Sequence, residues 1–476
     1  MQNLTENYID GQWVASGGTL TVDVINPATE QSIGQLTLGS AEDVDRAAQA
    51  AQRAFATWSL TSREERVALL ERLLSEFDQR ADELANAITE EMGAPPHLAT
   101  AAQCGLAREH IRVGIETLRD YDFDHEMNTT LVRMTPIGVC GLITPWNVPA
   151  SVIATKIVPA LATGCTVVLK PSEYSPYSAR LIAEMIHDAG YPAGVFNLVY
   201  GDGETVGNAI SGHPSIDMVS ITGSTRAGIA VAVNAAQTVK RVHQELGGKS
   251  ANVILPSADI DDAVQRGVKF LMWNSGQGCS LPSRMIVPRA KLDVVKEAVR
   301  KVESEIQPGP VGSNAYLGPV VNKNQFDSIQ KLIESGIAEG ATVVIGGPGK
   351  PEGLSTGYYV RPTVFVDTTP DMRIVREEIF GPVLVIQTYD DVDEAVRLAE
   401  DTQYGLAAYV EAGTLEEARE IGLRLTAGQV YLNGAELDQA APFGGFKQSG
   451  NGREWGPYAF EAFLEPKALL GYQPAR

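Results

Sequence analysis

From residue 138 onward the chain alternates short apolar runs with stretches of helical periodicity, and this alternation restricts the fold more than any other feature. Apolar runs stand at 138–143, 166–169, 196–199 and 218–221, and helical spacing at 149–162, 176–189, 203–211 and 226–236. Strands that are apolar throughout are typical of parallel sheets that helices cover on both faces. The sequence therefore predicts an α/β fold built on a doubly wound parallel sheet.

A second series of the same kind follows. Strand-like runs stand at 251–255, 285–287, 383–386 and 430–433, and helix-like stretches at 259–274, 290–305 and 322–339. A chain of 476 residues exceeds what one hydrophobic core usually holds. We therefore expect a second α/β domain, with the boundary at the Gly247-Gly248 pair. Ahead of both series, residues 7–38 favour short strands, and a helical layer that Ser40 begins runs to about Arg119.

Two residues suited to chemistry on a carbonyl group lie on either side of this boundary. Glu245 ends a strand-like run just before the two glycines, and Cys279 closes the stretch Gly276-Gln277-Gly278. A thiolate can attack a carbonyl carbon, and a carboxylate nearby can act as a base. The other cysteines lie in helical or strand patterns, and we interpret them as buried apolar residues: Cys104, Cys140 and Cys165.

Other polar candidates follow the predicted strands of the first series. Asn147 could donate an amide hydrogen to an oxyanion, although an Asn before Val-Pro is usually a turn residue. Lys170 and Glu173 could bond ribose hydroxyls, because ligands bind at the carboxyl ends of parallel strands; a surface ion pair is the simpler interpretation. Gly223 and Ser224 precede a helix whose N-terminus could hold a phosphate.

These motifs together resemble those of the NAD(P)-dependent aldehyde dehydrogenase superfamily. The run Glu245-Leu246-Gly247-Gly248-Lys249 and the Gly-Gln-x-Cys stretch at Cys279 stand in the expected order, and the resemblance runs from about residue 7 to the C-terminus. It implies two Rossmann-like domains and a small β oligomerisation hairpin. The expected limits are 1–117 and 137–246 for the dinucleotide-binding domain, 247–447 for the catalytic domain, and 118–136 with 448–476 for the arm and C-terminal tail.

The resemblance also implies roles for individual residues. Cys279 would be the nucleophile, Glu245 the general base that activates water, and Asn147 the oxyanion donor together with the Cys279 N–H. Glu378 would bond the nicotinamide ribose and Phe380 would pack near the ring, while Lys156 has either a structural or a ribose-contact role. The residues expected to bind the cofactor are Ile143, Thr144, Pro145, Trp146, Lys170, Ser172, Glu173, Gly203, Gly223, Ser224, Leu246, Glu378 and Phe380.

The cofactor is expected to be NAD, with NADP the less favoured choice. Glu173 would repel a ribose 2′-phosphate and accept a hydrogen bond from a 2′-hydroxyl. Arg226 favours the opposite choice, because it could pair with that phosphate. No metal site is expected, since the six histidines show no ligand spacing.

The substrate is expected to be a bulky, uncharged aldehyde, aromatic or terpenoid-like. By the resemblance, the aldehyde channel would be lined by Val148, Ser151, Val152, Thr155, Trp273, Ser280 and Leu437, and no Arg or Lys stands among them. The alternatives are a broad-specificity enzyme, a semialdehyde dehydrogenase, a coenzyme-A-acylating relative and a non-catalytic structural protein. Relatives that release the thioester to coenzyme A typically lack the general-base Glu, so Glu245 favours hydrolysis.

Composition limits the possible partners and location. The formal net charge of −21 argues against a nucleic-acid partner. The N-terminus lacks the pattern of a signal peptide and no apolar run could span a membrane, so we expect a cytoplasmic protein without a membrane partner. Apolar stretches at 131–134 and 468–472 lie outside the strand–helix alternation. The resemblance implies that they join subunits of a homodimer or homotetramer, and a self-contained hairpin is the alternative.

Overall fold

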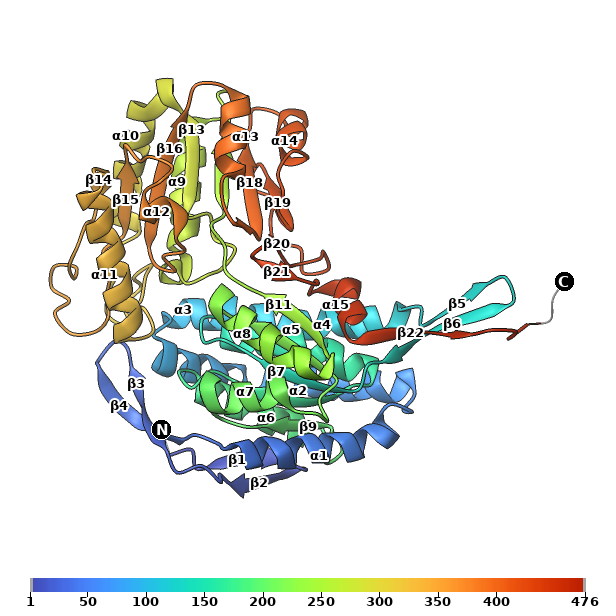
Figure 1. The fold of residues 1–476 in the computed structure, drawn as a ribbon. Coiled ribbons are helices and arrows are strands. Elements are labelled where there is room, and N and C mark those ends of the chain that lie inside the picture. Colours follow the sequence, from blue (N-terminus) through green and yellow to red (C-terminus); the bar gives the residue numbers. More distant parts are fainter. Residues whose placement is uncertain (1–2, 474–476) are drawn as a thin grey trace.

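The computed structural model describes residues 3–473, and it shows two lobes and a projecting arm (Figure 1). Each lobe is built on one mainly parallel sheet with helices packed against it, so the predicted α/β class with two Rossmann-like units is confirmed. We call the lobe with the eight-stranded sheet the first lobe and the lobe with the seven-stranded sheet the second lobe. The domain limits given above stay a prediction.

The sheet of the first lobe runs in the order β2-β1-β9-β8-β7-β10-β11-β21. Its central strands are parallel, and their residues are almost all buried, as their continuous apolar character predicts. The bounds are Gln12–Ala15 (β2), Glu6–Ile9 (β1), Phe196–Leu198 (β9), Thr166–Lys170 (β8), Val139–Ile143 (β7), Met218–Thr222 (β10), Arg241–Glu245 (β11) and Gly450–Asn451 (β21).

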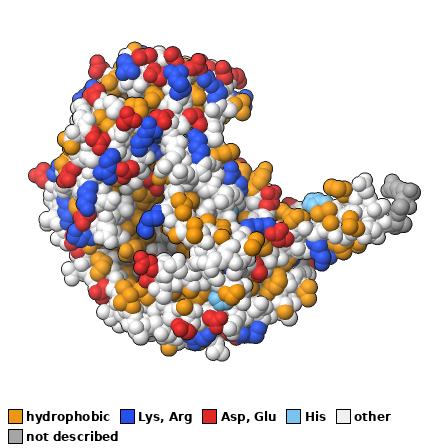
Figure 2. Space-filling model, in the orientation of Figure 1, with side chains coloured by type: hydrophobic (Ala, Val, Ile, Leu, Met, Phe, Trp, Pro, Cys, Tyr) orange, Lys and Arg blue, Asp and Glu red, His pale blue; other side chains and the backbone are white. Residues whose placement is uncertain are grey.

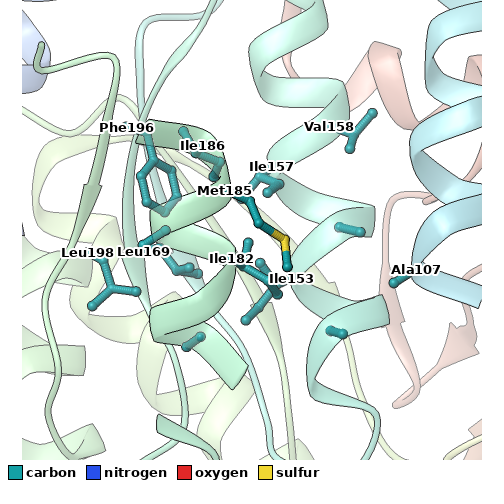
Figure 3. Packing of buried hydrophobic residues seen from close by; sticks show 14 of the residues in the cluster. Ala107, Ile153, Ile157, Val158, Leu169, Ile182, Met185, Ile186, Phe196 and Leu198 are labelled. Atoms are coloured by element: carbon teal, nitrogen blue, oxygen red, sulfur yellow. The ribbon is translucent and has the colours of Figure 1, made fainter. Parts of the chain in front are cut away.

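Helices cover both faces of this sheet. Ser40 and Ser62 each begin a helix with a capping box, in which the serine side chain and an acidic side chain three residues on satisfy free backbone N–H groups. Figure 3 shows the core where Ile182 and Met185 of α6 meet Ile153 of α5. The bounds are Ala41–Trp58 (α1), Arg63–Met92 (α2), Pro96–Leu98 (α3), Gly105–Asp120 (α4), Pro149–Thr163 (α5), Pro176–Asp188 (α6), Asn208–Gly212 (α7), Thr225–Ala235 (α8) and Gly456–Ala462 (α15).

The sheet of the second lobe runs in the order β14-β15-β16-β13-β12-β18-β19. Its strands are Thr342–Ile345 (β14), Thr363–Val366 (β15), Val383–Tyr389 (β16), Arg284–Pro288 (β13), Ala251–Ile254 (β12), Ala407–Glu411 (β18) and Gln429–Leu432 (β19). Its helices are Ile260–Met272 (α9), Leu292–Val302 (α10), Lys323–Ala338 (α11), Arg373–Arg376 (α12), Val392–Glu400 (α13) and Leu415–Gly422 (α14). The predicted series lacked β14, β15, β18, α12, α13 and α14.

The two lobes are connected by crossings of the chain on one side and by a hairpin contact on another (Figure 1). On one side it crosses from β11 to β12 and later returns to β21, and the crossings are bonded to each other: Leu246 N–H donates to Ser449 O at 2.9 Å, and Ser449 Oγ donates to Gly247 O at 2.7 Å. On the other side the hairpin of Thr21–Asn26 (β3) and Gln31–Thr37 (β4) reaches the second lobe, where Lys350 Nζ lies 3.0 Å from Glu30 Oε1.

The arm is a three-stranded sheet, Asp124–Met127 (β5), Thr130–Pro136 (β6) and Leu464–Leu469 (β22), in the order β22-β6-β5. The C-terminal strand thus begins and ends earlier than the predicted stretch 468–472, because it pairs with β6 from Pro136 back to Leu131. Figure 2 shows hydrophobic side chains on the arm, and acidic and basic side chains interspersed over the visible face of the lobes. Within residues 3–473, no helix is both long and apolar enough to span a membrane.

Candidate active site

Cys279 stands on a backbone turn that few sequences could adopt. After α9 ends, Asn274, Ser275 and Gly276 have φ values of 51°, 56° and 73°, three left-handed residues in succession. A Cβ on Gly276 would lie 2.0 Å from Gly381 O, so this position requires glycine. The turn brings Cys279 to the cleft between the lobes, where its side chain is partly exposed.

Side-chain amides hold this turn in place. Asn274 Nδ2 donates to Asn147 O at 3.0 Å, and Gln277 Oε1 accepts from Val321 N–H at 2.9 Å. Asn147 Nδ2 donates to Gln277 O at 3.0 Å. An amide nitrogen carries two hydrogens, so Asn147 retains one for a further acceptor. The amide that the sequence singled out as an oxyanion donor is therefore tied directly to the turn that carries Cys279.

The Cys279 thiol is held in its protonated form. Burial raises the pKa of Cys279 to about 12, and the carboxylates of Glu378 and Glu245 raise it further. A thiol with so high a pKa contributes little thiolate near neutral pH. Attack on a carbonyl therefore requires a base, or a change in the surrounding charges.

Glu245 ends β11 and is only 2% exposed. Within the described part of the chain, neither of its carboxylate oxygens has a hydrogen-bond partner. Gly444, with a φ of 146°, makes room for it: a Cβ there would lie 2.5 Å from Glu245 Oε1. Burial raises the pKa of Glu245 well above its usual range, and the charge of Glu454 adds to this. Such a carboxyl group favours its protonated form, and only when it is ionised can it take a proton from water.

A cavity of about 1090 Å³ between the lobes brings the predicted catalytic residues together. Asn147, Glu245 and Cys279 all line it. So do seven of the residues expected to bind the cofactor, namely Pro145, Trp146, Gly223, Ser224, Leu246, Glu378 and Phe380. All seven residues predicted for the aldehyde channel also line it: Val148, Ser151, Val152, Thr155, Trp273, Ser280 and Leu437.

The other six predicted cofactor residues do not line this cavity: Ile143, Thr144, Lys170, Ser172, Glu173 and Gly203. They stand at or just beyond the carboxyl ends of the neighbouring strands of the first lobe. Ile143 is paired with Lys170, and Lys170 Nζ donates to Gly201 O at 2.9 Å and lies 3.8 Å from Glu173 Oε2. These residues form a polar edge of the parallel sheet, where such sheets bind ligands.

Glu378 and Phe380 reach the cavity from the second lobe. Glu378 Oε1 accepts a hydrogen bond from Gly248 N–H at 3.0 Å, and burial raises the pKa of Glu378 to about 7. Phe380 meets Trp146 edge to face with ring centroids 5.5 Å apart. Both residues therefore bring side chains of the second lobe into contact with the region where the lobes meet, at Gly248 and Trp146.

A chain of buried polar residues lies behind Glu245, and the sequence did not predict it. Lys156 Nζ donates to Ser220 Oγ at 2.8 Å and to Glu454 Oε1 at 2.7 Å, and Ser220 Oγ lies 2.9 Å from His243 Nδ1. Lys156 is fully buried in this ion pair and does not line the cavity, which favours its structural role over a ribose contact. The available signal was spacing: His243 stands two residues before Glu245 on a strand, and hence on the same face.

The walls of the cavity also contain groups that the sequence did not suggest. Tyr409 and Tyr431 stack with ring centroids 4.7 Å apart, and Phe443 and Trp455 stack at 4.4 Å. Arg266 lines the cavity too, with its guanidinium 3.0 Å from Glu411 Oε2 and 2.7 Å from Asp262 Oδ2. No clear sequence signal marks these residues, because α9, β18, β19 and the C-terminal segment meet only in the folded chain.

Comparison with known proteins identifies relatives over almost the whole chain. The profile of the aldehyde dehydrogenase family matches residues 13–469. The chain is 52% identical to 3-succinoylsemialdehyde-pyridine dehydrogenase of a Pseudomonas species, over 99% of this chain and 100% of the relative. It superposes with a TM-score of 0.98 and 51% identity on a mutant of aldehyde dehydrogenase C from Pseudomonas syringae in complex with NAD⁺ and octanal, which covers 100% of this chain and 98% of that one. An aldehyde dehydrogenase from Bartonella henselae gives a TM-score of 0.96 and 45% identity, over 99% of this chain and 100% of that one.

Proposed function

The chain belongs to the aldehyde dehydrogenase family, and we propose that it oxidises a bulky, uncharged aldehyde to a carboxylic acid with NAD through a thioester on Cys279. The observation that carries this proposal is the common cavity of Cys279, Glu245 and Asn147, in which a nucleophile, a base and an oxyanion donor surround one space. The wall of the same cavity includes the residues expected at the nicotinamide end of the cofactor.

The reaction divides into formation and hydrolysis of the thioester. The Cys279 thiol first loses its proton to water, and the thiolate sulfur then bonds to the aldehyde carbon. The resulting oxyanion accepts hydrogen bonds from the free Asn147 amide hydrogen and the Cys279 N–H. Bound NAD supplies the hydride acceptor that converts this adduct to the thioester. Glu245 then takes a proton from a water molecule, whose oxygen attacks the thioester carbon and releases the acid and the thiol.

The residues at the edge of the first sheet fit a dinucleotide. Lys170, Glu173 and Gly203 stand at the carboxyl edge, and Ser224 caps the N-terminus of α8 beside the cavity, which suits a phosphate. We propose that Glu173 bonds the ribose 2′-hydroxyl and disfavours NADP. Arg226 is exposed on α8, and NAD⁺ is the dinucleotide in the complex of the Pseudomonas syringae relative.

The charges of the cavity support an uncharged substrate. Its lining holds five carboxylic residues (Glu245, Glu378, Glu411, Glu436 and Glu454) and a single guanidinium, that of Arg266. Glu411 and Asp262 already neutralise this guanidinium, so it offers little to the carboxylate of an acidic semialdehyde. The stacked pairs Tyr409–Tyr431 and Phe443–Trp455 give the same cavity aromatic walls. Octanal, bound by the relative from Pseudomonas syringae, is likewise uncharged.

Specificity constants for four classes of aldehyde test this proposal. With NAD and then NADP, we expect benzaldehyde-type and long aliphatic aldehydes to exceed both acetaldehyde and succinic semialdehyde in kcat/KM by about tenfold or more. Arg266→Gln is the matched control, and it should leave the constants for uncharged aldehydes within about twofold. A wild-type preference for succinic semialdehyde that Arg266→Gln removes would show that this guanidinium binds the substrate. Equal constants for all four classes would show a broad-specificity enzyme.

A further inference from the structure

Five buried polar residues form a continuous chain behind the proposed base. From Glu454 it runs through Lys156, Ser220 and His243 to Glu245, and the last step, from His243 Nε2 to Glu245 Oε1, is 3.7 Å. Every member is at most 5% exposed. The two ends differ: Glu454 is paired with a cation, whereas the Glu245 oxygens and His243 Nε2 have no hydrogen-bond partner among the residues that the structure describes.

The hydrogen-bond network fixes which nitrogen of His243 carries the proton. Lys156 can only donate, so Ser220 Oγ is an acceptor toward it. Among residues 3–473 the hydroxyl has one other partner, His243 Nδ1, so its own hydrogen has an acceptor only if Nδ1 is unprotonated; the opposite tautomer would leave that hydrogen unbonded in a buried place. His243 is neutral, because burial and the charge of Lys156 lower its pKa to about 4. The single ring proton is therefore on Nε2, on the side of Glu245.

A buried donor without an acceptor thus faces a buried carboxylate without a donor. Leaving both groups unpaired costs more free energy than joining them, and a small rotation of the Glu245 side chain would close the 3.7 Å gap to hydrogen-bond distance. The imidazole has less freedom to move, since a Cβ on Gly452 would lie 2.0 Å from His243 Cδ2. Among residues 3–473, no Lys or Arg nitrogen lies within 4.0 Å of a Glu245 oxygen.

We propose that His243 is a positioning residue for Glu245: its Nε2–H binds the carboxylate, keeps it ionised near neutral pH, and so supplies the base for thioester hydrolysis. The inference rests on the proposed function, in which Glu245 activates water. Burial and the charge of Glu454 both favour the protonated carboxyl, which cannot accept a proton. A hydrogen bond donated to the ionised form opposes them.

The groups around His243 make it a fixed donor and not a switch. Lys156 faces it from α5, Arg453 and Glu454 from the segment before α15, and Arg241 from its own strand. Three of these four charges are positive and oppose protonation of the ring, in the same direction as burial. The ring therefore stays neutral through the pH range in which Glu245 titrates, and any pH dependence belongs to the carboxyl.

Two amide substitutions separate this role from mere packing. In His243→Gln the side-chain amide reaches the place of Nε2 and can still donate to Glu245, whereas in His243→Asn it reaches only the place of Nδ1, toward Ser220. The measurement is the rate constant of thioester hydrolysis against pH, from intact mass spectrometry of samples quenched after one turnover with NAD and an aldehyde. We expect the acid limb to move up by about one pH unit in His243→Asn, so that the rate at a fixed pH on the lower part of this limb falls about tenfold, and to stay near that of the wild type in His243→Gln.

The rate of the NADH burst, which reports thioester formation, should be unchanged in both variants. Superimposed profiles for wild type and His243→Asn, or equal shifts in the two variants, would overturn the role of His243. If thermal melting shows that His243→Asn is not folded, Ser220→Ala is used in its place. This variant removes the hydroxyl that fixes the tautomer, and an unshifted acid limb there would also overturn the inference.

Glu245→Gln separates a failure of this inference from a failure of the proposed function. It should give one burst of NADH and then accumulate the thioester. If Glu245→Gln turns over at the wild-type rate, Glu245 is not the base and the proposed function is wrong at that step. If it stalls while His243→Asn keeps the wild-type profile, only the role of His243 is wrong.

Discussion

At the scale of single residues, the surroundings of Cys279 keep its thiol protonated, and a protonated thiol reacts slowly. The thiol is surrounded by low-dielectric protein and two carboxylic side chains, which raise its pKa to about 12. A thiolate formed there would be a strong nucleophile, but the resting side chain is nearly all protonated at neutral pH. Oxidants and alkylating agents react with the thiolate, so the same environment protects the sulfur from side reactions.

The first prediction concerns this thiol. Below its pKa the thiolate fraction increases about tenfold per pH unit, so the rate of alkylation of Cys279 by iodoacetamide without NAD should increase steadily from pH 7 to pH 10. Peptide mass spectrometry after timed quenching measures the rate at this residue, and Cys279→Ala shows the background from the other cysteines. A plateau between pH 7 and pH 8 would contradict the raised pKa.

The sequence was enough to identify the main polar residues of the cavity, but it did not identify the residues that surround them. Cys279, Glu245 and Asn147 were recognisable because each stands in a short motif at the end of a strand or beside glycines, and they do line one cavity. Their catalytic roles stay predictions. His243 was not recognisable, because its meaning depends on Ser220, Lys156 and Glu454, which reach it from other elements.

At the scale of elements, α5 serves both the core and the cavity. Ile153 and Ile157 point into the packing shown in Figure 3, while Ser151, Val152 and Thr155 line the cavity. Because the helix is packed along nearly its whole length, its cavity-facing side chains are held in fixed places. Small residues on that face leave volume beside Cys279.

The second prediction fills this volume. Ser151→Phe should lower kcat/KM for a benzaldehyde-type substrate by about tenfold or more and leave that for acetaldehyde within about threefold, since only the larger substrate needs the space. Steady-state kinetics with both aldehydes measure the ratio. Ser151→Ala is the matched control and should change neither value by more than about twofold. Equal losses for both aldehydes would place the substrate elsewhere.

The strands of the sheets were predictable where they were apolar and uninterrupted. β7, β8 and β10 stand out because most of their residues are apolar, which is typical of strands buried in a parallel sheet. β18 was missed, since its sequence Ala-Ala-Tyr-Val-Glu has two alanines and a glutamate, which strands disfavour, and only its neighbours β12 and β19 hold it in place. The short helices α13 and α14 have too few turns for a clear periodicity.

At the scale of the whole molecule, the arm extends away from both lobes and exposes apolar side chains. Met127 is 63% exposed and Leu470 is 84% exposed. The outer strands of the arm, β5 and β22, offer backbone groups along their free edges within the described chain. A monomer rarely keeps such an extension uncovered, and a second copy of the chain is the partner that we expect.

The third prediction tests this contact. The double variant Met127→Glu with Leu470→Glu should lower the mass measured by light scattering from that of an oligomer toward that of a single chain, because it places charges in an apolar contact. Leu20→Glu, which makes the same change at a residue 58% exposed near the N-terminus, should leave the mass unchanged. An unchanged mass in the double variant would show that these side chains do not join subunits.

The two lobes are also fastened at opposite sides, and this determines how the cleft can move. A hinge motion between two lobes requires one flexible connection and, on the other side of the cleft, a rim where the lobes do not contact each other. Here the paired crossings at Gly247 and Ser449 close one rim, and the contact of Glu30 with Lys350 closes the other. Opening the cleft about one of these connections would separate the residues that are in contact at the other. A hinge-like opening of the cleft would therefore have to separate contacts on both rims at once, whereas entry from the ends of the cleft would separate neither.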